Sequence, residues 1–311
     1  MKVVALVFFI LIFGQSRSFS QDTSVFIDEK AVTLKEVVVR NHLNVPDFIQ
    51  RVKNDTTFYK AFLNLRTIGY TSINDIRMLD KKGQTKASLS SRTKQETGKG
   101  CRWMKILQSN VKGDIYDRDG QYNYYTPQMY ASIFFAPDTV CGETNIVAGS
   151  SFSTRNKSGL AKHKEQLKML FFNPGNKIPG LPFISNKIAL FDKDVAERYD
   201  FIVDMEDFKG ENCYVFRIVP LTTASKGDIV INEMTTWFNS ENWEITGRSY
   251  DLSYNAGVYD FDVHIEVEMT KFGDLLLPKV MRYNGNWDLV FKKREKGVFT
   301  ATLFDFTANP H

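Results

Sequence analysis

Hydrophobic and polar residues alternate strictly along the stretch from Tyr259 to Met269. One face of this stretch is apolar and consists of Tyr259, Phe261, Val263, Ile265, Val267 and Met269. The other face is charged or polar and consists of Asp260, Asp262, His264, Glu266 and Glu268. A period of two over a whole strand predicts a sheet with one buried face and one face in water.

The same alternation recurs from Tyr199 to Phe306 and is broken only by short turns. Such short links require antiparallel neighbours, and Asn284-Gly285 is the strongest hairpin signal among them. A meander of this length must curl to protect its edges. The sequence therefore predicts an α+β fold, a long antiparallel β-meander curled into a half-open barrel with a few helices packed on or in it. The predicted strands begin at Tyr199, Cys213, Asp228, Trp243, Tyr259, Leu275, Trp287 and Val298.

Helices are predicted ahead of this sheet. Asn44 is placed to cap a helix that has Pro46 in its first turn and Phe48, Ile49 and Val52 on one face. The other elements expected before the final sheet are an apolar piece with Phe58, Phe62 and Leu63, strands over Thr67–Gly98, Cys101–Gln108 and Ile115–Tyr125, a short helix from Pro127 and a helix capped by Ser158.

The amino-terminal segment Met1–Gln21 has the character of a cleavable export signal. Lys2 precedes the apolar run Val3–Phe13, which is too short to span a bilayer, and a plausible cleavage site lies near Ser18–Gln21. The alternative is a membrane anchor. The sequence thus predicts an exported protein at the periplasm or the outer-membrane periphery of a Gram-negative bacterium.

Residues 22–45 form a lead-in segment, and 46–311 are expected to form a single α+β domain with an irregular insertion at about 126–190. Within the lead-in, Thr33–Val39 is a β-prone stretch that could pair with an existing sheet edge. It resembles a phrase common in envelope proteins of Bacteroidetes, which implies lineage and compartment but no further domain.

Charge argues against one class of partner. The chain has 40 basic and 36 acidic residues, and loss of Lys2 and Arg17 with the signal leaves 38 against 36. Nucleic-acid binding requires a concentrated basic face, so no nucleic acid is expected as a partner. A short basic run lies at Lys292–Lys296. It could contact anionic lipid headgroups, which leaves peripheral membrane association open. The preferred interpretation is a solvated strand edge whose lysines prevent pairing with another strand.

Three cysteines are too few for a disulfide scaffold, and their spacing suits no metal site. Cys213 alternates within a strand and is expected to be a small buried residue. Cys101 and Cys141 form the possible disulfide, since an oxidising compartment permits one bridge and one free thiol.

Candidate catalytic chemistry is sparse. No nucleophile elbow, His-Glu-x-x-His motif, P-loop or dinucleotide fingerprint occurs, so no catalytic residue, metal ligand or cofactor is predicted. Asp117, Asp119 and Gly120 resemble the start of a calcium loop without its late Glu, and a hairpin turn is the preferred interpretation. The acidic face at Asp260–Glu268 is interpreted as a solvated strand face with Arg248, Lys279 and Arg282 opposite it. Paired carboxylates for glycoside chemistry remain open, because their spacing exists only in three dimensions.

Aromatic residues are frequent, with 25 Phe and 13 Tyr. They either fill the interior of a curved sheet or line a groove for an acyl chain or a hydrophobic peptide. The candidate groove residues are Tyr122, Tyr124, Phe134, Phe135, Trp237, Phe261, Trp287 and Phe291.

The sequence resembles the periplasmic lipoprotein-carrier superfamily, of the LolA/LolB type, in its repeated strand–turn–strand pattern. The stretches that carry this resemblance are Tyr199–Val203, Trp237–Asn239 and Trp243–Ile245. The resemblance covers mainly residues 60–306, and no carrier residue can be transferred individually. It implies an unclosed β-barrel with a helical lid over a cavity that shields acyl chains.

The leading hypothesis is a non-enzymatic envelope protein that binds a lipid, a lipoprotein acyl chain or another apolar ligand. The alternative is a structural or interaction module that docks an envelope protein through a sheet edge or a loop. A third candidate is an integral barrel of about eight strands. Apolar residues on both faces of Tyr214–Val219 favour a packed sheet over that candidate.

Overall fold

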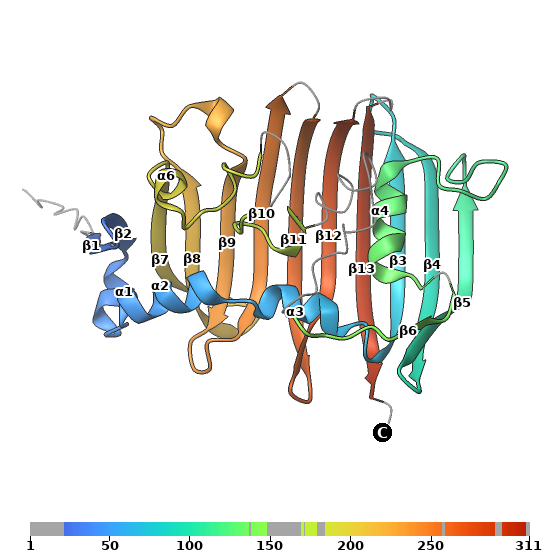
Figure 1. Ribbon diagram of the computed structural model, residues 1–311, viewed down its shortest axis with the longest axis horizontal. Coiled ribbons are helices and arrows are strands. Elements are labelled where there is room, and N and C mark those ends of the chain that lie inside the picture. The colour runs from blue at the N-terminus through green and yellow to red at the C-terminus, as the bar shows by residue number, and fades with distance from the viewer. Residues whose placement is uncertain are drawn as a thin grey trace, which may run out of the picture.

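A computed structural model of the chain describes residues 22–136, 138–147, 169–170, 172–178, 184–256, 259–289 and 294–308. Within these residues, one 13-stranded sheet spans the structure (Figure 1). Its strands are β1 Thr23–Ile27, β2 Lys30–Leu34, β3 Gly69–Leu79, β4 Thr85–Gly98, β5 Cys101–Lys112, β6 Val140–Cys141, β7 Tyr199–Phe208, β8 Glu211–Pro220, β9 Ile231–Asn239, β10 Ile245–Ala256, β11 Tyr259–Phe272, β12 Leu275–Leu289 and β13 Glu295–Thr307.

The sheet order is β1-β2-β7-β8-β9-β10-β11-β12-β13-β3-β4-β5-β6. From β7 to β13 each strand pairs antiparallel with the next, as the short turns predicted. The strand β13 then pairs antiparallel with β3, so the last strand in the sequence lies beside one that begins at Gly69. The order begins with β1 and ends with β6, so the sheet is open. The predicted α+β class, an unclosed meander with a few helices, is confirmed.

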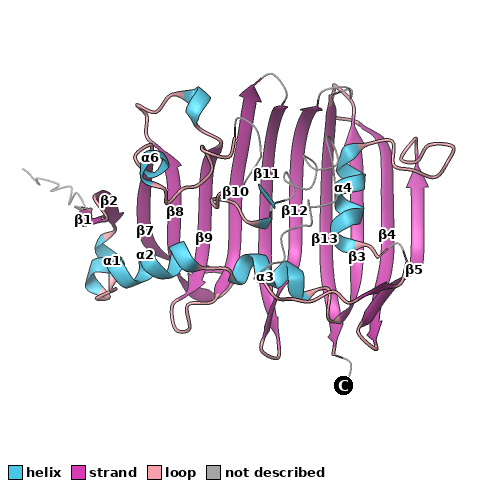
Figure 2. Cartoon of the chain, in the orientation of Figure 1, coloured by secondary structure: helices cyan, strands magenta, loops and turns pink. Residues whose placement is uncertain are grey.

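The helices lie on one face of the sheet, which we call the inner face (Figure 2). In Figure 1, α2 and α3 cross its lower part and α4 lies along β13 and β3. The helices are α1 Glu36–Arg40, α2 Val45–Asn54, α3 Thr57–Asn64, α4 Tyr125–Phe134 and α6 Lys193–Ala196, with a 3₁₀ turn at Lys226–Asp228.

The helix α2 forms as its sequence predicts. The side chain of Asn44 accepts a hydrogen bond from the backbone N–H of Asp47, and Pro46 lies in the first turn. Phe48, Ile49 and Val52 are buried against the sheet. Burial of this apolar stripe, rather than helix propensity, holds a helix of only ten residues in place.

The core lies between the helices and the inner face. On β11, Phe261, Val263, Ile265 and Val267 are each at most 1% exposed, whereas Asp262 on the opposite face is exposed. Figure 1 shows β11 near the middle of the sheet, between its antiparallel neighbours β10 and β12. The alternation in the sequence therefore sets which face of the whole meander is buried.

The predicted hairpin at Asn284-Gly285 is wrong, because both residues lie inside the continuous strand β12. Gly285 pairs with Val263 on one side and Gly297 on the other. A Cβ at Gly285 would collide with the hydroxyl of Tyr283, whose ring folds over the glycine on the same face. The glycine thus makes room for an aromatic ring and not for a turn. The strand predicted from Val298 also begins earlier, because β13 starts at Glu295.

Two other elements differ from the prediction. The strand expected over Ile115–Tyr125 reduces to one bridge between Tyr116 and Tyr122, and α4 begins at Tyr125. Asp117 closes this loop by accepting hydrogen bonds from the backbone N–H groups of Asp119 and Gln121, which supports the turn over a calcium loop.

The β-prone stretch Thr33–Val39 is divided between two elements. Thr33 and Leu34 belong to β2, which pairs in parallel with β7 and lies next to the edge strand β1. Glu36–Arg40 instead forms the short helix α1, in which Val38 is fully buried. A helical turn buries one valine of this run and leaves Val37 and Val39 exposed. The predicted signal over 1–21, the helix expected after Ser158 and Phe291 lie outside the described residues.

Candidate functional site

Aromatic rings pack around Phe48 on the inner face under α2. Its ring lies 5.5 to 6.2 Å from the rings of Tyr214, Phe216, Phe238 and Trp243. These edge-to-face and tilted contacts are the favoured geometries of aromatic pairs. Three of these rings, those of Phe48, Phe238 and Trp243, also line a pocket.

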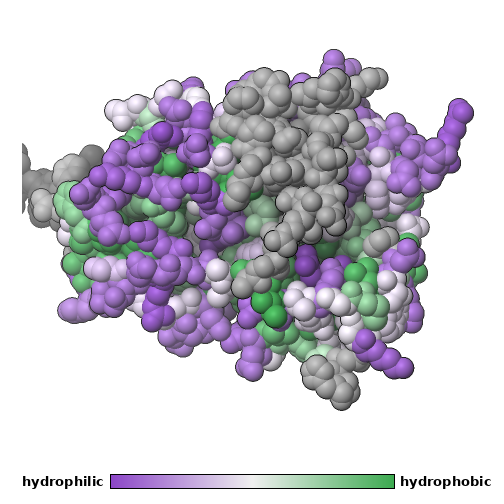
Figure 3. Space-filling model, in the orientation of Figure 1, coloured by the Kyte–Doolittle hydropathy of each residue, from purple (hydrophilic) through white to green (hydrophobic). Residues whose placement is uncertain are grey.

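A pocket of about 610 Å³ opens between the helices α2 and α3 and two hairpins of the sheet. We call it the rim pocket. Its apolar lining is Phe48, Val52, Phe238, Trp243, Leu275 and Leu276. In Figure 3, hydrophobic residues reach the surface in the lower middle of this face, where Figure 1 shows α3.

Trp243, which lines the rim pocket, is held in an unusual backbone conformation. Its φ is 65°, which bulky residues rarely adopt. Asn239 stabilises the turn by accepting hydrogen bonds from the backbone N–H groups of Glu241 and Asn242. The indole stacks on Tyr214 at 5.1 Å, so packing offsets the backbone strain. Strained residues of this kind concentrate at binding sites.

A buried ion pair lies behind the pocket. The guanidinium of Arg248 is 4.0 Å from the carboxylate of Asp55, and the two side chains are 7% and 12% exposed. Arg248 also donates a hydrogen bond to Thr236 and lies 4.3 Å from the centre of the Phe58 ring. Burial lowers the pKa of Arg248, and the carboxylate of Asp55 acts against this shift.

Asp55 has a second role at the start of α3. One carboxylate oxygen accepts hydrogen bonds from the backbone N–H and the hydroxyl of Thr57, at 3.0 and 2.6 Å. The other carboxylate oxygen is buried and has no hydrogen-bond partner among the described atoms. Asp55 therefore links the start of α3 to the floor of the sheet. Arg248 is not opposite the acidic face of β11, as the sequence suggested, because its side chain lies on the inner face.

The structure brings three of the predicted groove residues into a filled core. Phe134, Phe261 and Trp287 are each at most 1% exposed. The rings of Phe261 and Trp287 are 5.1 Å apart, and Trp287 donates a hydrogen bond to the hydroxyl of Tyr283. Tyr283 in turn stacks on Phe299 at 4.5 Å. Protein side chains fill this part of the inner face.

The other groove candidates are divided. Tyr122, Tyr124 and Phe135 are partly buried beside α4, and the hydroxyl of Tyr124 donates to Asp114 at 2.6 Å. Trp237 does not join the cluster, because it lies on the opposite face of β9 from Phe238 and stacks on Phe208 at 4.4 Å.

Polar side chains line the inner face at β3 and β4. Tyr130 of α4 donates a hydrogen bond to Asn74 at 2.6 Å. Asn74 donates to Ser91 at 3.1 Å and to Thr93 at 3.3 Å. Asn74 and Thr93 are each 1% exposed, so these hydrogen bonds are shielded from water.

The start of α4 is held by a carboxylate from the sheet. Glu295 accepts hydrogen bonds from the backbone N–H groups of Tyr125 and Thr126, at 2.9 and 2.7 Å. A negative charge at a helix N-terminus is favourable, and it satisfies two backbone donors that lack partners within the helix. Gly297 lies beside it, where a Cβ would collide with Thr126.

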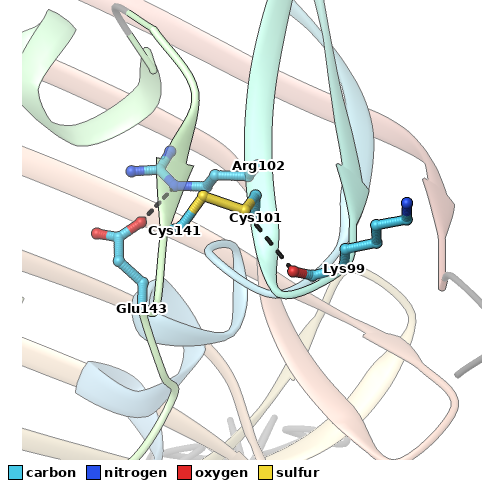
Figure 4. The surroundings of a disulfide bond; sticks show 5 residues. All are labelled: Lys99, Cys101, Arg102, Cys141 and Glu143. Atoms are coloured by element: carbon cyan, nitrogen blue, oxygen red, sulfur yellow. Dashed lines mark hydrogen bonds and ion pairs between the residues drawn. A yellow bond between two sulfur atoms is a disulfide. The ribbon is translucent and has the colours of Figure 1, made fainter.

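A disulfide joins Cys101 of β5 to Cys141 of β6, with an S–S distance of 2.06 Å (Figure 4). These are the two cysteines that the sequence singled out as a possible pair. The bridge lies next to Arg102, which donates a hydrogen bond to Glu143 at 2.6 Å. The third cysteine, Cys213, is free and buried, and burial raises the pKa of its thiol.

The polar face of β11 carries charge pairs. Arg282 lies 2.6 Å from Glu268 and 3.5 Å from Glu266, and Asp251 and Glu266 each contact one nitrogen of His264. Among the described residues, no group of three or more His, Cys, Asp or Glu side chains could hold a metal ion. No described helix is long and apolar enough to cross a membrane.

Sequence reasoning missed most of the rim pocket. Arg51, Lys60, Asn242 and Asp274 were not singled out, and Glu244 entered only as part of the stretch Trp243–Ile245. The sequence did hold one indication of this pocket. Trp243 directly follows a polar turn, and local structure alone gives no reason for a tryptophan there, which indicates a tertiary contact or a binding role. The pocket itself arises from tertiary packing between two segments far apart in the chain, 48–64 and 238–276.

No known protein family matches the chain, and no curated protein matches it. Its neighbours among solved structures include a DUF1329 family protein from Desulfovibrio piger, with 10% identity and a TM-score of 0.26, covering 81% of this chain and 92% of that one. They also include a putative outer membrane lipoprotein-sorting protein domain from Vibrio parahaemolyticus, with 11% identity, a TM-score of 0.27, and 83% and 89% coverage.

A LolA superfamily protein from Nitrosomonas europaea is a third neighbour, with 9% identity, a TM-score of 0.25, and 82% and 93% coverage. The superfamily that the sequence resembles is therefore among the structural neighbours. TM-scores of 0.25 to 0.27 carry no assignment of function. What the chain binds has to be inferred from its own side chains.

Proposed function

We propose that this protein is an exported, non-enzymatic envelope protein that binds a lipid, a lipoprotein acyl chain or another apolar ligand at the rim pocket. The observation that carries the proposal is the apolar wall of that pocket, which continues into the aromatic cluster around Phe48. Ligand pockets have volumes of roughly 300–1,000 Å³ and combine an apolar lining with a few polar groups. The rim pocket has both properties.

The location is part of the same proposal. The segment Met1–Gln21 has the composition of an export signal, and the Cys101–Cys141 bridge suits an oxidising compartment. We place the protein in the periplasm or at the outer-membrane periphery. Cell fractionation tests this directly, and recovery of the protein with the signal intact in the cytoplasm would contradict it.

Ligand binding is tested on the purified full chain by native mass spectrometry, lipid extraction and titration with an apolar fluorescent dye. The Leu275→Trp substitution should fill the rim pocket and weaken dye binding at least about tenfold. Ile73→Trp is the matched control, since Ile73 is 51% exposed and does not line the pocket. Equal dye binding by both variants would contradict the location, and absence of both lipid and dye binding would contradict the function.

The alternative function is docking of an envelope protein through a sheet edge. One observation favours it: β5 pairs with β6 only at Cys101 and Arg102, so the rest of its outer edge carries no described strand. Ile106, Leu107 and Val111 on this edge are 71%, 52% and 43% exposed. An unpaired edge with exposed apolar residues is suited to strand addition. A stoichiometric partner whose binding is lost on Ile106→Lys substitution, with no lipid bound, would favour this function.

A further inference from the structure

The charged residues of the rim pocket are separated by sign. Arg51 of α2 and Lys60 of α3 are exposed and line the side formed by the helices. Glu244 and Asp274 line the side formed by the two hairpins. The remaining charged residue in the lining, Asp55, is paired with Arg248 behind the pocket. We call the basic residues from the helices the cationic wall, the acidic residues from the hairpins the acidic wall, and the apolar lining residues the floor.

The acidic wall is only partly neutralised. Lys271 contacts the carboxylate of Glu244 at 2.8 Å. This hydrogen bond raises the pKa of Lys271, and the negative charge of Asp274 raises it further. Two carboxylates thus share one ammonium group, which leaves a net negative charge on this wall. On the cationic wall, the guanidinium of Arg51 lies over the hairpin residue Trp243, 5.4 Å from the centre of its ring, and this contact restrains the arginine.

A ligand with a single charge does not fit this arrangement. An anionic head would approach Arg51 and Lys60 but would also face the carboxylates of Glu244 and Asp274, and like charges in a partly desolvated site are unfavourable. A cationic head would be attracted by the two carboxylates but repelled by Arg51 and Lys60. A head that carries both signs can satisfy both walls while its chain contacts the apolar floor.

We infer that the ligand is a zwitterionic phospholipid, whose phosphate faces Arg51 and Lys60 and whose ammonium group faces Glu244 and Asp274. This inference rests on the proposed function, since it names the class of apolar ligand that the rim pocket takes. Charge complementarity supplies selectivity among lipids, and contact with the apolar floor supplies most of the affinity.

The test compares two short-chain lipids that differ in the head alone, dihexanoyl phosphatidylethanolamine and dihexanoyl phosphatidylglycerol. Dissociation constants are measured by calorimetry on the full chain below the lipids' micelle-forming concentrations. We expect the ethanolamine lipid to bind about fivefold or more tighter, which corresponds to one partly exposed charge interaction.

Two variants test which part of the lipid head each wall contacts. Asp274→Asn should weaken binding of the ethanolamine lipid about fivefold and strengthen binding of the glycerol lipid, because it removes an attraction in one case and a repulsion in the other. Lys60→Gln should weaken binding of both lipids. Asp262→Asn is the matched control for the acidic variant, since Asp262 is exposed on the opposite face of the sheet.

The outcomes separate the two proposals. Equal binding of the two lipids, with no change of preference in Asp274→Asn, would overturn the zwitterionic ligand and leave an apolar-ligand pocket intact. Binding of neither lipid, together with absence of dye binding, would overturn both. A preference for the ethanolamine lipid that is lost in Asp274→Asn and kept in Asp262→Asn would support the inference.

Discussion

The inner face has two halves that differ in chemistry. Under α2 and α3, it is built from aromatic rings around Phe48 and opens at the rim pocket. At β3 and β4, it is built from Asn74, Ser91 and Thr93, which α4 meets through the hydroxyl of Tyr130. We call these the aromatic half and the polar half.

This difference indicates which half can replace contacts within the protein by contacts with a ligand. Apolar contacts are non-directional, so an acyl chain can replace one ring contact with another at little cost. Buried hydrogen bonds are directional, and a donor or acceptor left without its partner costs about 1–3 kcal/mol. The polar half therefore fixes α4 in position, while the aromatic half can accommodate an apolar guest.

The largest effect is expected from Phe48→Ala in the aromatic half. Loss of this ring removes contacts to four other rings and should lower the free energy of unfolding by about 3–5 kcal/mol. Chemical denaturation measures the change. Phe26→Ala is the control, because Phe26 is 73% exposed and should change stability by less than about 0.5 kcal/mol. Similar effects of the two substitutions would contradict the packing described for α2.

The disulfide should come next. It closes a segment with a sequence separation of 40, and its loss by Cys101→Ser with Cys141→Ser should cost about 2–4 kcal/mol. Thermal unfolding with and without reductant measures this contribution. The double variant is its own control, since reductant should lower the stability of the unsubstituted protein and leave the variant unchanged. A protein that ignores reductant would argue against the bridge.

A smaller effect is expected in the polar half from Asn74→Ala. The substitution leaves the hydroxyl of Tyr130 without its acceptor and should lower the free energy of unfolding by about 1–3 kcal/mol. The exposed Asn110→Ala on β5 is the matched control. Tyr130→Phe combined with Asn74→Ala should cost less than the sum of the two single changes, and additive costs would show that the hydrogen bond does not couple these residues.

The smallest effect concerns pH and lies outside both halves. Burial lowers the pKa of His264, but hydrogen bonds to Asp251 and Glu266 outweigh it, and the pKa ends above the usual value of 6.5. A raised pKa in the folded state means that His264 stabilises the fold most below that usual value and loses this contribution as pH rises through the folded-state pKa.

The imidazole resonances of His264, followed by NMR during a pH titration, measure this pKa. We expect a midpoint above 6.5 in the native protein and a lower midpoint after Asp251→Asn. The stability lost in His264→Gln should be greater at pH 5.5 than at pH 9. A midpoint unchanged by Asp251→Asn would mean that the 2.7 Å contact carries no electrostatic weight.

The sequence was sufficient for elements whose signals are local. The cap at Asn44 and the apolar stripe of α2 are readable within one helix, and the alternation along β11 sets its buried face. It was misleading at Asn284-Gly285, because the reason for the glycine is the ring of Tyr283, which occupies the space of a Cβ. Local turn chemistry cannot reveal such a reason.

The candidate site was harder to anticipate than the fold. Trp237 and Phe238 are adjacent in sequence, yet only Phe238 lines the rim pocket, because successive strand residues point to opposite faces. Arg51 and Glu244 give no sign of a shared pocket, since only the docking of α2 and α3 across the sheet brings them together. Composition identified an excess of aromatic rings, and tertiary structure decided which of them surround a pocket.

The pairing of β13 with β3 has a consequence for how the protein is made. The strand β3 ends at Leu79, whereas its partner β13 begins only at Glu295. The strands β3, β4 and β5 therefore keep one unpaired edge until Glu295–Thr307 has been synthesised and has paired with β3. Contacts of such sequence separation fold slowly and leave edges prone to misassembly. A chain exported from its amino terminus would therefore need protection of β3 until the last strand arrives.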